Sequence, residues 1–145
     1  MQTRKGDSWM PADDYGRTLP LFTVNLVVKD LAKSLDFYTQ VLGAKRVYSD
    51  PDFAALRLKE LEFMLHADHT YDHHAWYPGL KGGEPRGLGA ELRLFHFDPD
   101  ATEARAKQFG ARILQPSKDM PHGWRDVIVE DPDGYTWAVG MAKPK

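Results

Sequence analysis

The sequence predicts an α+β protein in which two βαβββ repeats form a curved mixed sheet around a central, ligand-sized cup. The chain has 145 residues, of which 42% are hydrophobic, which is sufficient for one packed core. The order strand, helix, glycine, strands occurs twice, and Asp30 to Gly43 aligns with Asp98 to Gly110. A single helix for each set of strands is too little to cover both faces of a sheet. We therefore expect the uncovered faces to enclose the cup.

The first repeat is expected over residues 20–67. Asp30 is a typical helix N-cap, and Leu31, Leu35 and Tyr38 recur on one helical face. Gly43 marks the helix end. The expected elements in chain order are a strand at Leu21–Val28, a helix from Asp30 to Leu42, and strands at Lys45–Ser49, Phe53–Leu58 and Leu61–Ala67.

A polar segment at 68–87 is expected to be a long linker loop, and the second repeat follows at 88–142. Asp98 and Pro99 predict the start of its helix. The expected elements in chain order are a strand at Glu91–Phe97, a helix to Phe109, and strands at Arg112–Gln115, Trp124–Glu130 and Tyr135–Met141. Asp131–Gly134 is a strong hairpin signal between the last two strands.

Residues 1–19, the N-terminal arm, lie outside the repeats and show no periodicity. The arm carries Trp9, Met10 and Tyr15. Two interpretations remain open: a frayed terminus, or an arm whose aromatic residues pack on the domain or on a partner subunit. Residues 20–145 are expected to form one domain.

Composition excludes several classes of protein. The chain has no cysteine, which rules out disulfides and thiolate metal sites and favours the reducing cytoplasm. The formal net charge of −2 provides no basic surface for nucleic acid or anionic lipid. No apolar run approaches the ~18 residues of a membrane span. We expect a cytoplasmic protein that binds neither nucleic acid nor membrane.

Strand alternation predicts which side chains face the cup. The mixed faces of the strands should bring together Asn25, His66, Glu91 and Arg93, with Phe95 on the same face as the last two. Placed polar groups in a mostly apolar pocket are typical of ligand sites. His66 and Glu91 could form an acid–base pair, or they could be a satisfied polar contact within the wall. The alternative for each residue is a solvated position on an edge strand.

Two further groups could carry chemistry. Trp124 and Arg125 could stack on and grip a planar or anionic ligand, or the tryptophan could only fill the core. Histidines 66, 69, 73 and 74, with Asp68 and Asp72, could bind a divalent ion. The spacing of this cluster matches no recognised ligand pattern, so a surface role is the alternative.

The sequence resembles the vicinal oxygen chelate superfamily, which includes glyoxalase I, bleomycin-resistance proteins and extradiol dioxygenases. The residues that carry the resemblance are Asn25–Asp30, Asp36–Tyr38, Val41–Gly43, Trp124–Arg125 and Val129–Tyr135. The resemblance covers about residues 20–142 and implies paired βαβββ modules, often in a homodimer. In the metalloenzymes it also implies four inward His or Glu ligands. Their positions here hold Thr23 (or Asn25), Met64, Glu91 and Ala138.

Only Glu91 of those residues is a strong ligand, whereas a catalytic divalent site needs about three protein donors. We therefore expect a small-molecule-binding protein of the bleomycin-resistance type, with no metal and no cofactor. The alternatives are a metal-dependent lyase or dioxygenase with displaced ligands, and a structural interaction module. The expected catalytic residues are Glu91 and His66. The expected ligand-binding residues are Asn25, Met64, Arg93, Phe95, Trp124, Arg125 and Ala138, and the ligand should have an apolar body and a polar group.

Overall fold

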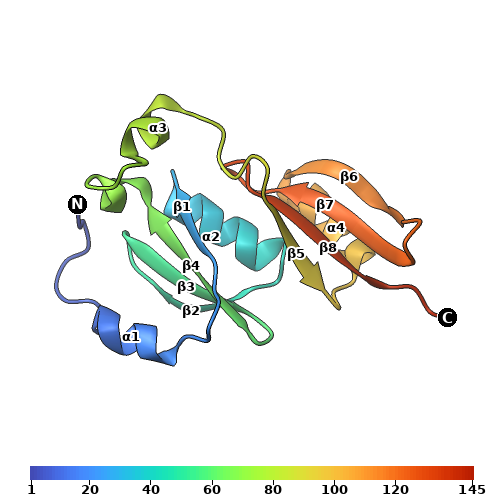
Figure 1. The fold of residues 1–145 in the computed structure, drawn as a ribbon, viewed down its shortest axis with the longest axis horizontal. Coiled ribbons are helices and arrows are strands. Elements are labelled where there is room, and N and C mark those ends of the chain that lie inside the picture. Colours follow the sequence, from blue (N-terminus) through green and yellow to red (C-terminus); the bar gives the residue numbers. More distant parts are fainter. The chain divides into compact units, whose positions relative to one another are not determined.

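The computed structural model describes residues 1–145, which form two compact units (Figure 1). The first unit comprises Met1–Leu35 and Ala44–Glu84, and the second comprises Asp36–Gly43 and Pro85–Lys145. Each unit contains one open, four-stranded mixed sheet. The predicted α+β class, with two repeated strand–helix–strand modules, is confirmed.

The sheet of the first unit has the strand order β1-β4-β3-β2. Its elements are α1 (Ala12–Thr18), β1 (Asn25–Val28), the start of α2 (Leu31–Gln40), β2 (Lys45–Ser49), β3 (Phe53–Leu58), β4 (Leu61–Ala67), η1 (Asp68–Tyr71) and α3 (Tyr77–Gly82). Strands β1 and β4 pair in parallel, with Asn25 opposite Met64, and the other pairs are antiparallel. The sheet therefore has β1 and β2 as its edges.

The sheet of the second unit repeats this arrangement in the order β5-β8-β7-β6. Its elements are β5 (Glu91–Phe95), α4 (Pro99–Phe109), β6 (Arg112–Asp119), β7 (Trp124–Glu130) and β8 (Thr136–Ala142), together with the end of α2. Strands β5 and β8 pair in parallel, with Arg93 opposite Ala138. Helix α4 packs against β6, β7 and β8, as Figure 1 shows.

Equivalent signals begin and end the two helices of the repeat. The Asp30 carboxylate accepts a hydrogen bond from the backbone N–H of Lys33 (3.1 Å), and the Asp98 carboxylate accepts one from the N–H of Asp100 (2.9 Å). Each bond satisfies a backbone donor that the first helical turn leaves without a partner. Gly43 and Gly110 follow the helices with φ of 74° and 83°, a conformation that glycine adopts without strain.

A buried polar chain connects the end of α2 to the β7–β8 hairpin of the second unit. The Tyr38 hydroxyl donates to Asp131 Oδ2 (2.6 Å), and the indole N–H of Trp137 donates to the Tyr38 oxygen (3.1 Å). Asp131 Oδ1 accepts the backbone N–H groups of Asp133 (2.9 Å) and Tyr135 (2.8 Å). Burial raises the pKa of Asp131 to about 6, although the hydrogen bonds from Tyr38 and from the backbone favour its charged form.

Three predicted strands differ from the observed ones by two or more residues at one end. The first strand begins at Asn25 rather than Leu21, where its parallel pairing with β4 starts opposite Met64, and the Leu21 and Phe22 side chains before it are exposed. The strand at Glu91 ends at Phe95, since the next residue has a positive φ. Strand β6 continues to Asp119 past a proline, which the outer position of this strand and its register shifts permit.

The segment 68–87, expected as a long loop, contains the short helices η1 and α3. Helix α3 begins with a proline in its first turn and ends at Gly83, which has a φ of 72°. The proline and glycine signals are present in the sequence, but they are brief, and the polar composition of the segment predicts a loop. No helix of the chain is long and apolar enough to span a membrane.

We predict that Asp131→Asn changes how stability depends on pH. A folded-state pKa above the ordinary Asp value means that the fold binds the proton more tightly than the unfolded chain does. The stabilisation of the fold by protonated Asp131 is therefore fully present below the ordinary Asp pKa and is lost as the pH rises through about 6. When the pH falls from about 7.5 to about 4.5, urea denaturation should show the free energy of unfolding of the native chain rising by about 1–3 kcal/mol relative to that of the variant. A difference that stays constant with pH, or grows toward neutral pH, would contradict this assignment.

Candidate functional site

The candidate site lies on one face of the first sheet. On β4, Phe63 and Leu65 are fully buried, and Met64 and His66 alternate with them on the opposite, partly accessible face. Phe53 of β3 is the register partner of His66, and their ring centroids are 5.0 Å apart. The expected mixed face of β4 is therefore present, and an aromatic side chain extends it.

The N-terminal arm packs its aromatic residues on this unit. Trp9 stacks on Tyr48 with ring centroids 4.8 Å apart, and Tyr15 meets Phe53 edge-on at 5.8 Å. The Tyr15 hydroxyl donates a hydrogen bond to Glu62 Oε2 (2.8 Å), and burial together with this carboxylate raises the pKa of the hydroxyl. Of the two interpretations of the arm, the structure shows packing on the chain's own first unit.

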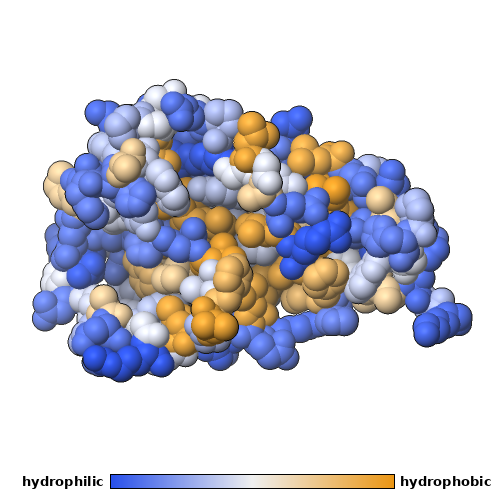
Figure 2. Space-filling view, viewed as in Figure 1, coloured by the Kyte–Doolittle hydropathy of each residue, from blue (hydrophilic) through white to orange (hydrophobic).

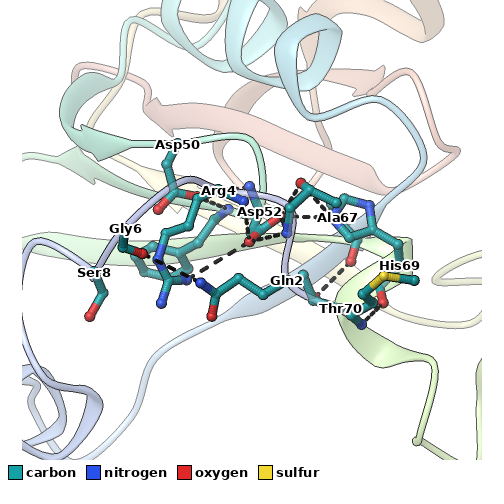
Figure 3. A network of polar contacts seen from close by, with 12 residues as sticks. Gln2, Arg4, Gly6, Ser8, Asp50, Asp52, Ala67, His69 and Thr70 are labelled. Atoms are coloured by element: carbon teal, nitrogen blue, oxygen red, sulfur yellow. Dashed lines mark hydrogen bonds and ion pairs between the residues drawn. The ribbon is translucent and has the colours of Figure 1, made fainter.

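One carboxylate, that of Asp52 in the β2–β3 turn, binds the start of the arm (Figure 3). It accepts the backbone N–H groups of Thr3 (2.8 Å) and Arg4 (3.0 Å), the Thr3 hydroxyl, and His69 Nε2 (2.8 Å). The side chain of Asp52 is nearly inaccessible to solvent. Burial opposes its charged form, but the hydrogen bonds from His69, Thr3 and Arg4 outweigh burial and lower its pKa below the ordinary value.

Arm and sheet together enclose a pocket of about 570 Å³, which we call the arm pocket. Phe53, Met64 and His66 line it from the sheet, and the arm contributes residues that include Arg4, Trp9 and Tyr15. Figure 2 shows hydrophobic residues gathered on the first unit between α1 and α3. The volume lies within the range of small-molecule sites, about 300–1,000 Å³.

His66 has a defined orientation at the pocket. Its Nδ1 lies 2.6 Å from Asn25 Oδ1, and the Asn25 amide nitrogen donates to the Tyr71 hydroxyl (2.6 Å). The Asn25 carbonyl oxygen is an acceptor, so Nδ1 of His66 carries a proton. Burial lowers the pKa of His66, which keeps the ring neutral at pH 7. Its Nε2 is then a lone-pair acceptor that can take a hydrogen bond or a proton from a bound molecule.

The predicted site residues of the second unit form a separate polar and aromatic group. Arg93 Nε donates to Glu91 Oε1 (2.6 Å), and Arg93 pairs with Ala138 in the β-ladder. Phe95 packs edge-on against Trp124 with ring centroids 5.0 Å apart. These five residues share one face of the sheet, and the glutamate and arginine side chains are well exposed.

Arg125 does not join that group. It follows Trp124 on β7, so its side chain takes the opposite face. There it forms ion pairs with Asp100 of α4 (2.9 Å) and with Asp119 (3.1 Å). Within the second unit, a ligand that contacts Arg93 would therefore meet Trp124 but not Arg125.

The residues at the ligand positions implied by the resemblance do not fit a divalent metal. Met64 offers only a thioether and Ala138 a methyl group, and the Asn25 amide is engaged on both of its atoms. Thr23 donates its hydroxyl proton to a backbone carbonyl (2.6 Å). Glu91 is then the single strong donor, fewer than the three that a catalytic site requires.

The histidines of the 66–74 segment have separate partners. His69 binds Asp52, His73 lies 3.6 Å from Asp72, and the backbone N–H of Trp76 donates to His74 Nδ1 (3.1 Å). No three His, Asp or Glu side chains of the chain converge where they could hold a metal ion.

Sequence reasoning missed most of the arm pocket. Asp52 belongs to an Asp-Pro-Asp sequence that reads equally well as an ordinary turn, and Arg4 lies in a segment without periodicity. The available signal was the presence of Trp9 and Tyr15 in a terminal segment, since disordered tails rarely carry such residues. Nothing in their spacing indicated that they would pack beside Phe53.

Comparison with known proteins gives a consistent family and fold. Residues 21–139 match the family model described as Glyoxalase/Bleomycin resistance protein/Dioxygenase superfamily. Mb0911c of Mycobacterium bovis is 32% identical over 134 residues, covering 84% of this chain and 83% of that protein. Rv0887c of Mycobacterium tuberculosis is also 32% identical, covering 84% and 74%.

Solved structures share the fold at lower identity. A glyoxalase/bleomycin resistance protein/dioxygenase family enzyme from Burkholderia phytofirmans has a TM-score of 0.69 at 18% identity, covering 83% of this chain and 97% of that one. A glyoxalase/bleomycin resistance protein/dioxygenase from Nocardioides has a TM-score of 0.65 at 24% identity, covering 90% and 91%. Both likenesses establish fold rather than activity.

We predict that Asp52→Ala releases the N-terminal arm. The change leaves two backbone N–H groups, a hydroxyl and an imidazole without their acceptor, so the variant should lose about 1–3 kcal/mol of stability. Hydrogen exchange of residues 1–19 should become fast, whereas Asp13→Ala on the exposed face of α1 should leave it slow. In the native chain the arm should stay bound at neutral pH and loosen only as the pH falls below the ordinary Asp value of 3.8, because the charged form is the one it binds. Unchanged exchange in Asp52→Ala would show that the aromatic contacts alone hold the arm.

Proposed function

This chain belongs to the Glyoxalase/Bleomycin resistance protein/Dioxygenase superfamily, and we propose that it is a small-molecule-binding protein that uses the arm pocket without the usual divalent metal centre. The observation that carries the proposal is the pocket itself, a volume of about 570 Å³ between the β3–β4 face and the N-terminal arm. Its walls offer apolar and aromatic surface with a few placed polar groups, the composition typical of ligand sites.

The chemistry of the walls supports a molecule with a flat apolar body. Trp9, Tyr15 and Phe53 present ring surfaces within one connected group, and Met64 adds a flexible, polarisable side chain that adapts to irregular ligand shapes. The neutral His66 ring adds one hydrogen-bond acceptor at the edge of this surface. Such a site binds by apolar burial and orients its ligand through the imidazole.

We propose the polar and aromatic group of the second unit as a second, separate ligand-binding surface. Glu91 and Arg93 offer one acceptor and one donor, and Phe95 and Trp124 offer ring surface on the same strand face. The predicted acid–base pair of His66 with Glu91 stays a prediction, as does any catalytic step. Binding in the arm pocket requires only residues of the first unit.

We predict that Met64→Trp blocks the arm pocket. The larger side chain would fill the space over β4 while keeping a residue that suits a strand. The neutral fluorescent probe N-phenyl-1-naphthylamine should bind the native chain and lose at least tenfold in affinity to the variant, about 1.4 kcal/mol. Dialysis of the native chain against a chelator should leave probe binding unchanged.

Met141→Trp is the matched control, because Met141 lies on an exposed part of β8 in the second unit. It should retain native probe affinity, and both variants should melt close to the native temperature. Equal affinity for all three chains would contradict binding in the arm pocket. Loss of probe binding after chelation would contradict its independence from metal.

We also propose that the protein is a homodimer and acts in the cytoplasm, as the family resemblance and the cysteine-free composition lead us to expect. Sedimentation equilibrium should then give a species of twice the 16.5 kDa chain mass. A single 16.5 kDa species at micromolar concentration would contradict the dimer. Recovery of the protein from extracytoplasmic fractions of its host would contradict the location.

A further inference from the structure

We propose that Arg4 of the N-terminal arm is the anion receptor of the arm pocket, and that the ligand is an organic anion with a flat apolar body and one carboxylate, sulfonate or phosphate group. The inference rests on the proposed function, because it specifies the ligand class for the same pocket. It assigns the recognition of charge to a residue outside the repeats. The carrying observation is a guanidinium that lines the pocket without a hydrogen bond.

The guanidinium of Arg4 is poorly satisfied for its degree of burial. The side chain is 22% exposed, and its Nε is buried without a partner. Its single ionic contact is Nη1 to Asp52 Oδ2 at 3.8 Å, which is too long for a hydrogen bond. An arginine stays charged in proteins and carries five N–H donors, so a largely buried one normally has acceptors.

The nearby carboxylates are already bound to other donors. Both oxygens of Asp52 accept bonds from the backbone of Thr3, and the same carboxylate accepts the Arg4 backbone N–H and His69. Figure 3 shows Arg4 and His69 on opposite sides of Asp52. The nearest carboxylate thus binds the backbone of Arg4 and leaves the two Nη groups of the guanidinium without a hydrogen bond.

Asp50 is committed in the same way. Its Oδ1 accepts the backbone N–H groups of Asp52 (2.8 Å) and Phe53 (2.9 Å), and its Oδ2 accepts the Tyr48 hydroxyl (2.7 Å). These bonds stabilise the turn and disperse the negative charge of Asp50. At the pocket, the Arg4 guanidinium therefore has one ionic contact and no hydrogen-bond acceptor, and an anion is the ligand that supplies acceptors.

The geometry of a guanidinium sets the class of anion. Its planar fork matches the two oxygens of a carboxylate or the oxygens of a sulfonate or phosphate, with two parallel charge-assisted hydrogen bonds. Trp9 and Tyr15 lie in the same arm, so a ligand bound by Arg4 would lay its apolar body against rings that the arm also supplies. The arm then supplies both the charged contact and the ring surface for the ligand.

The test compares two probes that differ in one charged group. 8-Anilinonaphthalene-1-sulfonate carries a sulfonate, and N-phenyl-1-naphthylamine is its neutral counterpart. The native chain should bind the sulfonate more tightly. Arg4→Gln should weaken sulfonate binding at least tenfold, about 1.4 kcal/mol, and leave the affinity for the neutral probe unchanged within a factor of two. Arg4→Lys keeps the charge without the fork and should give an intermediate affinity.

Arg17→Gln is the matched control, because Arg17 belongs to the same arm but is well exposed and pairs with Asp13 and Asp14. It should change neither affinity. Hydrogen exchange of residues 1–19 should stay slow in Arg4→Gln, since the bond to Asp52 comes from the backbone of residue 4. Together these results would support charge recognition by the Arg4 side chain.

Three results would overturn the inference while leaving the proposed function intact. They are an equal loss of both probes in Arg4→Gln, no loss of either, and a loss confined to the neutral probe. A native chain that binds the neutral probe but not the sulfonate would do the same. If the native chain binds neither probe, the proposed function itself fails.

Discussion

The first unit depends on the need of one buried carboxylate for hydrogen-bond donors. Asp52 is 3% exposed, and an ionised carboxylate at such a position is stable only if its oxygens are bound. The donors come from the first residues of the chain and from His69. These bonds fix the position of the first residues of the N-terminal arm, which has no periodicity. Trp9 and Tyr15, which follow in the arm, pack beside β2 and β3. The hydrogen bonds of Asp52 and the aromatic contacts of Trp9 and Tyr15 together place the arm beside the sheet, where it forms one wall of the pocket.

The polar groups around the pocket divide into satisfied and unsatisfied ones, and that division is more informative than the net charge. Counting charges would indicate two carboxylates against one guanidinium and would suggest a cationic ligand. Counting hydrogen bonds gives the opposite result, because Asp50 and Asp52 accept bonds from the chain itself, whereas the Arg4 side chain makes none. A neutral His66 adds no charge of its own. In a confined site, the donor that still lacks an acceptor sets ligand preference.

The fold could be predicted largely from the sequence because its signals are local. Helix caps at Asp30 and Asp98, the glycines that follow the helices and the alternation of β4 each require only neighbouring residues. The same reasoning correctly identified Met64, His66 and Asn25 as members of a mixed face. The arm could not be placed in this way, since the bond between Asp52 and Thr3 joins residues 49 positions apart. Long-range pairing of a nonperiodic segment leaves no pattern, and for this reason Arg4 was not among the predicted site residues.

Helix α2 gives the sequence repeat and the compact units different boundaries. Its first residues belong to the first unit, but Phe37 and Tyr38 pack with Phe109, Trp137 and Asp131 in the second. A fragment beginning after the linker would contain every strand of the second repeat and still lack two of the aromatic side chains at its centre. The buried Asp131 would then lose the hydroxyl that donates to it. The halves are alike as sequence patterns, but the second compact unit includes residues 36–43, so a fragment that begins after the linker lacks part of its core.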